Sequence, residues 1–339
     1  MENWTKRSTG FLSPLIDTRL WYKKLAATLV DMGFKILKSD SSVYILDNGS
    51  VRVILPVFVD NCILVSKSKA AIQEVKQKLL SHFKLRDLGP TSLLLGVAIS
   101  RDRAKHSISL SQKHYVEDIL ERFHIALPQM TDEDKQAMAS VPYINAVGAL
   151  MYLAIATRPD ISFAVSVLSR FNSNPGPDHW KAVKHLFRYL KGTMDHKLTY
   201  APLSSASKER FEVYSDADHG GNPDSGKSTS AYVVKMGTDA VSWSSKLQSI
   251  VALFTTEAEQ LLTELGYEAS GPTTPHMNNQ SVIQIARNPE HHYWLRDAVE
   301  NRTLSIDYVP TDSMAADILT KSMSKVNMEE ACKQLSLES

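Results

Sequence analysis

The stretch that decides the fold is Phe211-Glu212-Val213-Tyr214-Ser215-Asp216-Ala217-Asp218, in the last third of the chain. Its first five residues are predicted to form a strand, which ends at Asp216 beside Asp218 and the turn residues Gly220-Gly221. Two further acids, Glu259 and Asp317, lie in separate predicted helices. Carboxylates spread over separate elements make chemical sense if the fold gathers them in one cleft.

Converging carboxylates are what metal-dependent hydrolysis of a phosphodiester requires. Several acids hold two magnesium ions about 3.5–4 Å apart, so that both the attacking and the leaving oxygen are neutralised. The alternative is that Asp216 and Asp218 form a solvated turn and that Glu259 lies on a helix surface. From the residues alone both interpretations stay open.

Outward from this stretch, the chain alternates between strands and helices. Helices are predicted at residues 20–34, 70–83, 113–123, 143–156, 179–191, near 256–265, near 280–287 and from Ser313. Strands are predicted at residues 42–46, 51–59, 62–66, 93–101, 106–110, 211–215, 228–235, 240–244 and 303–309. Within Thr157-Arg158-Pro159-Asp160, Thr157 is expected to cap a helix that has Pro159 in its first turn.

Composition favours an ordinary globular chain. Of 339 residues, 43% are hydrophobic and 22% are charged, and the net charge is +1. A nucleic-acid surface would therefore have to come from local clustering of basic residues. Two cysteines without metal-like spacing fit a reducing compartment, and no signal peptide stands at the N-terminus. Residues 143–156 are too few to cross a bilayer. We expect an intracellular protein, in cytoplasm or nucleus, with no membrane partner.

Five blocks in the last third resemble the ribonuclease H domain of copia-type LTR-retrotransposon polyproteins. They are Ser215-Asp216-Ala217-Asp218, Gly226-Lys227-Ser228-Thr229-Ser230, Trp243-Ser244-Ser245-Lys246-Leu247-Gln248, Thr256-Glu257-Ala258-Glu259 and Ala316-Asp317-Ile318-Leu319-Thr320-Lys321. The resemblance implies a Mg²⁺-dependent nuclease that cuts RNA in RNA–DNA hybrids. It also implies that Asp216, Glu259 and Asp317 are the first, second and fourth metal ligands.

The chain departs from the family pattern at the third acid. Where the family has Asp-Asn-Gln-Ser, this chain reads Asn278-Asn279-Gln280-Ser281. An amide brings no charge and cannot bridge cations, so Asn278 is a degenerate ligand that weakens metal binding. The segment after Glu259 and the segment after His291-His292 are also shorter than the resemblance leads us to expect. We therefore expect an impaired ribonuclease H core.

A second resemblance lies near the N-terminus. The segment Val57-Phe58-Val59-Asp60-Asn61-Cys62-Ile63 resembles the reverse transcriptase palm hairpin of the same family, in which two aspartates follow an aromatic residue and valine. Asp60 matches the first aspartate, and Asn61 replaces the second. Ahead of Trp21 we expect no room for the strand that carries the palm's other essential aspartate. Since nucleotidyl transfer needs acids from two strands, polymerase activity is not expected, and Asp60 is a turn residue.

Basic residues form a stripe on the predicted helix at residues 179–191. They are Lys181, Lys184, Arg188 and Lys191. The stripe suits the phosphates of an RNA–DNA hybrid or a template–primer duplex, and the alternative is a solvated face.

The resemblance covers residues 21–323 and implies a mixed α/β architecture. We predict a palm remnant and start of the thumb (1–127), a linker (128–142), a helical thumb and connection region (143–203), a ribonuclease H-like domain with a mixed sheet (211–323) and a tail (324–339). The favoured hypothesis is a truncated, decayed reverse transcriptase/ribonuclease H fragment that still binds an RNA–DNA hybrid. Other parts of the polyprotein are further candidate partners. The alternatives are a residually active ribonuclease H and a co-opted, non-catalytic host protein.

Overall fold

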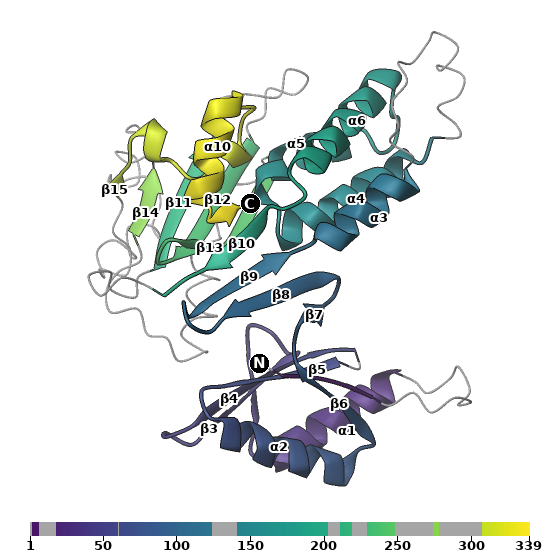
Figure 1. Cartoon of the computed structure of the whole chain (residues 1–339), viewed down its shortest axis with the longest axis vertical. Helices are drawn as coiled ribbons and strands as arrows, with labels where there is room; N and C mark the ends of the chain where they lie inside the picture. The colour runs from purple at the N-terminus through teal and green to yellow at the C-terminus, as the bar shows by residue number, and fades with distance from the viewer. Residues whose placement is uncertain are drawn as a thin grey trace, which may run out of the picture. The chain divides into compact units, whose positions relative to one another are not determined.

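The computed structural model describes residues 2–6, 18–59, 61–123, 141–202, 211–218, 229–247, 274–277 and 307–339. Of these, the residues up to Ser92 form one compact unit, and those from Leu93 onward form a second (Figure 1). Each unit combines helices with largely antiparallel sheets, which confirms the mixed α/β class predicted from the sequence.

The first unit is a six-stranded antiparallel sheet with two helices, in the strand order β2-β3-β4-β5-β1-β6. Its elements are β1 (Glu2–Lys6), α1 (Thr18–Asp31), β2 (Lys35–Ile36), β3 (Val43–Asp47), β4 (Arg52–Phe58), β5 (Asn61–Ser66), α2 (Lys69–His82) and β6 (Leu85–Pro90). The core joins Leu29 of α1 and Leu79 of α2 to Tyr44 and Leu55 of the sheet. Both helices therefore cover the same face of the sheet.

Local chemistry explains these elements. Alternate residues of β4 are buried, which leaves its other face less protected. Gly49, with φ +84°, permits the turn between β3 and β4. The Ser68 hydroxyl accepts a hydrogen bond from the Ala71 amide and so caps α2. The strands and helices predicted between residues 20 and 83 are thus confirmed, with small shifts of their ends.

The strand β1, like β2 and β6, is an element of this unit that the sequence did not predict. It lies between β5 and β6 and pairs antiparallel with both, with Asn3 opposite Ile63 and Thr5 opposite Arg86. A strand therefore does precede Trp21, although β1 contains no aspartate.

The second unit begins with a hairpin and a helical layer. Its first elements are β7 (Leu93–Leu94), β8 (Val97–Asp102), β9 (Ser107–Ser111), α3 (Lys113–Arg122), α4 (Tyr143–Ala156), η2 (Pro159–Ile161), α5 (Ser162–Ser169) and α6 (Pro177–Gly192). One side of α6 is apolar, and its residues Val183, Phe187 and Leu190 are fully buried. They share one core with Ile119 of α3 and Leu150 of α4.

Two five-stranded sheets complete the second unit, with the orders β16-β10-β9-β8-β7 and β13-β12-β11-β14-β15. Their remaining strands are β10 (Lys197–Tyr200), β11 (Phe211–Ala217), β12 (Thr229–Met236), β13 (Asp239–Leu247), β14 (Thr274–Met277), β15 (Asp307–Tyr308) and β16 (Leu337–Glu338). In the second sheet β11, β12 and β13 are antiparallel, whereas β14 runs parallel to both β11 and β15. The mixed sheet predicted for this region is therefore confirmed.

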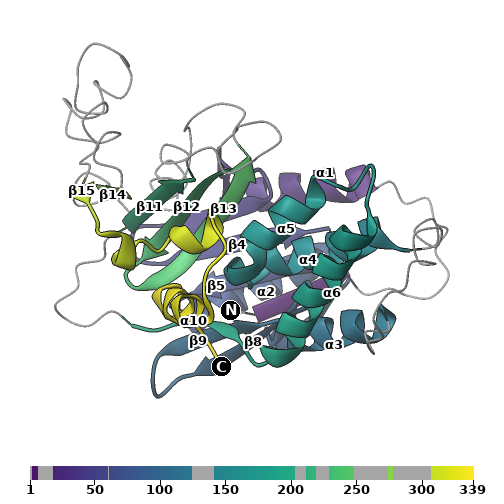
Figure 2. The same ribbon diagram turned by 90° about the horizontal axis from the view of Figure 1, so that it is seen from above.

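The last helical elements pack on the mixed sheet. They are the 3₁₀ turns η3 (Thr311–Ser313) and η4 (Asp317–Leu319) and the helix α10 (Lys325–Gln334). Ile318 and Leu319 of η4 and Leu335 next to α10 share a core with Val233 of β12 and Ala240 of β13. Figure 2 shows α10 and the adjoining turns alongside β11, β12 and β13. The helix predicted from Ser313 is therefore wrong in form: Asp317 lies on a short 3₁₀ turn.

The predicted role of Thr157 is also wrong. The Thr157 hydroxyl donates to Oε1 of Gln112 at 2.7 Å and caps no helix, while its backbone lies at the C-terminal end of α4. Pro159 does lie in the first turn of η2, as expected. A buried hydroxyl takes the partner that three-dimensional packing brings within reach, and Gln112 lies far from Thr157 in sequence. Residues 128–140 of the predicted linker (128–142) and the helices near 256–265 and 280–287 lie outside the described residues.

Candidate functional site

Two of the four predicted ribonuclease H positions come together. Asp216 projects from β11, and Asp317 is the first residue of η4. Their carboxyl groups share a hydrogen bond, and the Thr320 hydroxyl donates to Oδ2 of Asp216. Asp317 is only 3% exposed. The end of a sheet strand and a turn a hundred residues later in sequence thus build one acidic pocket. Glu259 and Asn278, the other two predicted positions, lie outside the described residues.

The electrostatics of this pocket are unbalanced. Burial and the neighbouring Asp216 raise the pKa of Asp317 to about 6, against the opposing effect of a lysine. That lysine is Lys321, whose Nζ lies 2.6 Å from Oδ2 of Asp317 and whose side chain is half exposed. Asp317 therefore faces a neighbouring acid, which raises its pKa, and a lysine, which lowers it. A perturbed acid pair of this kind is typical of functional sites.

The oxygens of this pocket fit magnesium. Carboxylate oxygens are the ligands that Mg²⁺ takes from proteins, and two of them converge here. Lys321 competes for one of them, because its ammonium group already lies against Asp317. Asp218, by contrast, is engaged in the fold: its Oδ1 accepts a hydrogen bond from the Thr229 amide. Asp218 therefore belongs to the strand connection between β11 and β12.

The hairpin of the first unit differs by one residue from the prediction. Asn61 is the first residue of β5 and pairs with Phe58, so it lies in the strand and not in the tight turn. Val59 lies at the tip with φ +56°, a backbone conformation that a β-branched residue rarely adopts. Its carbonyl accepts a hydrogen bond from Nε1 of Trp21 at 3.0 Å. Asp60 lies outside the described residues.

The predicted basic stripe follows one side of α6. Lys181, Arg188 and Lys191 are exposed, and Lys184 is partly exposed. Lys181 is paired with Asp178, with 3.0 Å between Nζ and Oδ1. Among the described residues, Lys184, Arg188 and Lys191 have no acidic group within ion-pair distance. Three cations along two turns of one helix are therefore free to meet an anionic partner.

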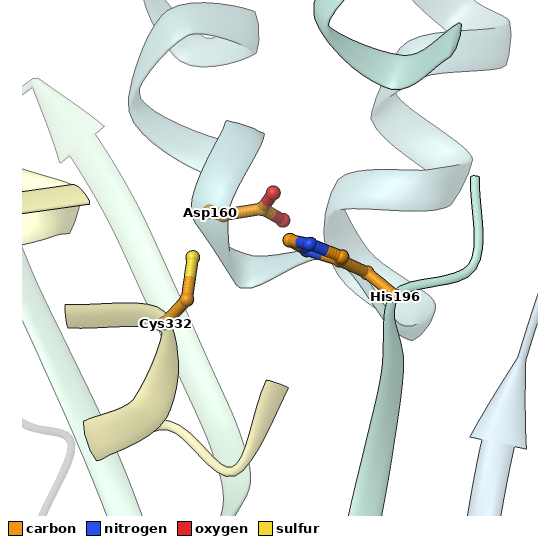
Figure 3. A group of neighbouring side chains, drawn as sticks. All are labelled: Asp160, His196 and Cys332. Carbon is orange, nitrogen blue, oxygen red and sulfur yellow. The ribbon is translucent and has the colours of Figure 1, made fainter. Parts of the chain in front are cut away.

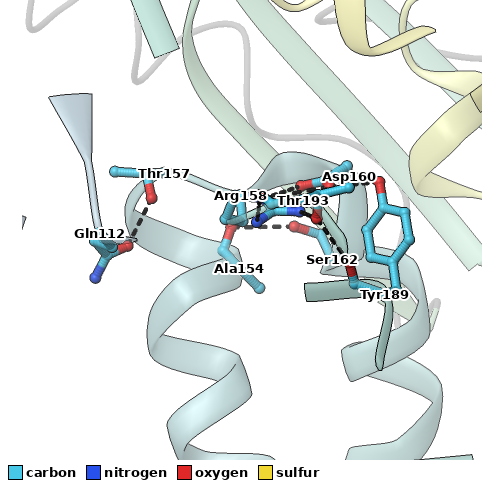
Figure 4. A network of polar contacts seen from close by, with 8 residues as sticks. All are labelled: Gln112, Ala154, Thr157, Arg158, Asp160, Ser162, Tyr189 and Thr193. Atoms are coloured by element: carbon cyan, nitrogen blue, oxygen red, sulfur yellow. Dashed lines mark hydrogen bonds and ion pairs between the residues drawn. The ribbon is translucent and has the colours of Figure 1, made fainter. Parts of the chain in front are cut away.

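A buried ion pair that was not predicted from the sequence lies beside the C-terminal end of α6 (Figure 4). Arg158 donates to both carboxylate oxygens of Asp160, through Nε to Oδ1 at 2.9 Å and through Nη2 to Oδ2 at 2.7 Å. Tyr189 donates to the same carboxylate, and Arg158 also donates to the carbonyl and hydroxyl of Thr193. The Arg-Pro-Asp spacing was read only as the start of a helix. Spacing alone holds no sign that both charges are buried.

This ion pair ties several elements together. Arg158 and Asp160 flank the start of η2, Tyr189 lies on α6, and Thr193 is the residue after α6. Ala154 at the end of α4 accepts hydrogen bonds from the Ser162 hydroxyl and from Nε1 of Trp243 on β13. The helical layer and the mixed sheet are therefore joined by satisfied polar contacts in addition to their apolar cores.

Comparison with known proteins identifies the family. The family model described as reverse transcriptase (RNA-dependent DNA polymerase) matches residues 16–138. The retrovirus-related Pol polyprotein from transposon TNT 1-94 of Nicotiana tabacum is 35% identical over 94% of this chain. The putative transposon Ty5-1 protein YCL074W of Saccharomyces cerevisiae is 30% identical over 71% of this chain and 82% of its own length. The chain belongs to the copia-type retrotransposon Pol family.

Within this family the chain is part of the Pol polyprotein, and the reverse transcriptase model covers its residues 16–138. The chain spans 27% of the length of the tobacco polyprotein. Among solved structures, that of LC11-RNase H1 in complex with an RNA/DNA hybrid aligns with 33% of this chain, at 18% identity and a TM-score of 0.23. In the described residues, no helix is long and apolar enough to cross a membrane.

Proposed function

We propose that this chain is a degenerate copia-type Pol fragment that binds RNA–DNA hybrid and has impaired or no catalytic turnover. The observation that carries the proposal is the acidic pocket: Asp216 and Asp317 converge, but the third family acid is replaced by Asn278. A site with fewer negative ligands holds divalent ions less tightly.

The pocket still defines which residues would hold magnesium. Asp216 and Asp317 supply the oxygens, with Glu259 as the third ligand by its match to the family. Bound magnesium supplies positive charge against the phosphate oxygens. The side chains do the rest: Thr320 orients the Asp216 carboxylate through its hydroxyl, and Lys321 sets how much negative charge Asp317 offers. The polymerase half of the proposal is simpler. Asn61 stands where a second palm aspartate would be needed, so nucleotide transfer is not expected.

A hybrid-cleavage assay tests the catalytic part. The full chain is incubated with magnesium and a labelled RNA–DNA hybrid, alongside Asn278→Asp and the double variant Asn278→Asp/Asp317→Asn. We expect little or no cleavage by the unchanged chain, a gain with Asn278→Asp and loss of that gain in the double variant. Full turnover by the unchanged chain would overturn the impairment.

Hybrid binding is the second part of the proposal, and α6 is its expected surface. Each phosphate neutralised by a basic side chain contributes about 0.9 to the slope of log K against log salt. The triple variant Lys184→Ala/Arg188→Ala/Lys191→Ala is therefore expected to reduce that slope by about 2–3. A matched control, Lys325→Ala/Lys333→Ala, removes two exposed lysines from α10. Equal slopes for both variants would reject α6 as the surface.

A residually active ribonuclease H is the second candidate function. The surviving contact between Asp216 and Asp317 favours it, because these two acids still meet. It predicts slow cleavage by the unchanged chain that Asp317→Asn abolishes. The same assay separates complete loss of turnover from residual turnover. Cleavage above background by the unchanged chain, absent in Asp317→Asn, supports the second candidate.

A further inference from the structure

A second cluster of metal-ligating side chains lies apart from the acidic pocket. It consists of Asp160 in η2, His196 in the turn between α6 and β10, and Cys332 in α10 (Figure 3). One ligand atom of each residue lies within 4.8 Å of the other two. The three residues are far apart in sequence, and the fold of the second unit alone brings them together.

We propose that Asp160, His196 and Cys332 form a binding site for a soft divalent cation, with Zn²⁺ as the best match. The site offers an imidazole nitrogen, a thiolate sulfur and a carboxylate oxygen, which are the three donors that Zn²⁺ takes from proteins. Sulfur and imidazole ligands disfavour Mg²⁺ and Ca²⁺, which need oxygen. The proposal does not depend on the ribonuclease H assignment.

The geometry is close to what zinc needs. Bonds of about 2.0–2.3 Å from a tetrahedral ion place its ligand atoms about 3.3–3.8 Å apart. Ligand atoms already within 4.8 Å of one another reach that spacing by small side-chain rotations. Three protein ligands leave the fourth tetrahedral position to water, as in zinc sites that are not purely structural.

His196 supplies an independent observation. Its Nδ1 is buried and has no hydrogen-bond partner among the described contacts. A buried polar atom without a partner destabilises the folded state. A cation bound at this nitrogen would remove that destabilisation, and burial keeps the ring neutral because it lowers the pKa of His196, as does the nearby Arg158. Neutral imidazole is the form that binds metal.

Asp160 keeps room for a cation despite its ion pair. A carboxylate accepts about four hydrogen bonds. Arg158 and Tyr189 donate to Oδ2, whereas Oδ1 accepts, among the described residues, only from Nε of Arg158 at short range. The guanidinium group thus fixes the orientation of the carboxylate, as the outer contacts of metal ligands commonly do. The positive charge of Arg158 lowers the affinity of the site for any cation. Preference for Zn²⁺ over Mg²⁺ comes from the thiolate of Cys332.

Binding exchanges one proton for one metal bond. The Sγ–H bond of Cys332 breaks, an Sγ–Zn bond forms, and the proton passes to the solvent buffer. Burial and the neighbouring Asp160 raise the pKa of Cys332 to about 12, so the thiol is protonated before the metal arrives. The other groups that face this thiol are Arg158, Tyr189 and Glu329.

A zinc titration tests the proposal. The full chain is freed of metal with a chelator and titrated with Zn²⁺ against a zinc-sensitive dye. We expect one equivalent to bind, and at least tenfold weaker binding in Cys332→Ser and in His196→Gln. Cys62→Ser, at the other buried free cysteine, is the matched control and should bind as the unchanged chain does. Equal affinity in all four proteins would overturn the site.

A second measurement needs no variant and so is independent of folding defects. Bound Co²⁺ should give a near-ultraviolet thiolate-to-cobalt absorption band in the unchanged chain. Zn²⁺ should slow alkylation of Cys332 and leave that of Cys62 unaffected, as followed by peptide mass. No absorption band, together with equal alkylation of the two thiols with and without Zn²⁺, would reject the proposal.

Discussion

Asp160 and Asp317 are both buried aspartates on 3₁₀ turns of the second unit, yet their surroundings shift the carboxyl pKa in opposite directions. The turns η2 and η4 that carry them pack against each other. Burial alone would raise the pKa of Asp160, but the charge and hydrogen bonds of Arg158 and Tyr189 lower it overall. At Asp317, burial and Asp216 prevail over Lys321, and the pKa rises to about 6. A buried acid that accepts hydrogen bonds from a cation and a hydroxyl ionises readily, whereas a buried acid beside another acid destabilises the fold when it ionises.

The largest expected effect is at Asp160. Asp160→Asn leaves the buried Arg158 without its counter-charge, and breaking a buried pair in this way costs about 3–5 kcal/mol. Urea unfolding at pH 7.5 measures it. A loss below about 1 kcal/mol would show that Arg158 finds other compensation and that the two aspartates differ less than the structure indicates.

Arg158→Lys should have the next largest effect, about 2–3 kcal/mol of destabilisation. Lysine keeps the charge but lacks the planar fork, so it cannot reproduce the two parallel hydrogen bonds to Asp160 together with the contact to Thr193. The same unfolding experiment tests it. If the variant were as stable as the unchanged chain, the positive charge alone, without the planar guanidinium group, would account for the difference between Asp160 and Asp317.

Asp317→Asn should act in the opposite direction and stabilise the chain. The pKa of this group is about 6 in the folded chain and near 3.8 when unfolded, so the folded state holds its proton longer as pH rises. Stability therefore falls as pH increases from about 4 to 6, by up to about 3 kcal/mol. The substitution should remove that fall. Its benefit should be present at pH 7.5 and absent at pH 4, and a variant that is less stable at pH 7.5 would contradict the comparison.

The smallest effect is expected at Lys321. Its side chain is 44% exposed, so the ion pair with Asp317 contributes at most about 1 kcal/mol. Lys321→Ala removes a contact that lowers the pKa of Asp317, so that pKa should rise above 6. Carboxyl NMR titration of Asp317 measures the shift. An unchanged midpoint would show that Asp216 and burial alone set the titration of this acid.

Periodic patterns predicted much of the fold. The apolar run at residues 143–156 matches α4, and the stripe of Val183, Phe187 and Leu190 marks the buried side of α6, because both depend only on neighbours along one helix. Elements without such a pattern were missed. The strands β1, β10 and β16 are short, and each is defined by the partner that it pairs with, which a linear sequence does not show.

The candidate site was predicted as far as a family pattern extends. Asp216 and Asp317 were named from motif order, and the structure brings them together. The opposing charge of Lys321 and the donors around Asp160 were not predicted, since both depend on burial and on contacts between distant segments. The roles of Glu259, Asn278 and Asp60 remain predictions, as do the domain boundaries.

The pairing of β10 with β16 has a consequence for how the chain is made. In the sheet β16-β10-β9-β8-β7, Lys197 lies opposite Glu338, so one edge of this sheet is completed only after residue 338 has been synthesised. The described strands of the first unit, by contrast, all lie before residue 91. On the ribosome the strands of the first sheet are complete while β10 still lacks β16, and an unpaired strand edge is prone to association with other chains.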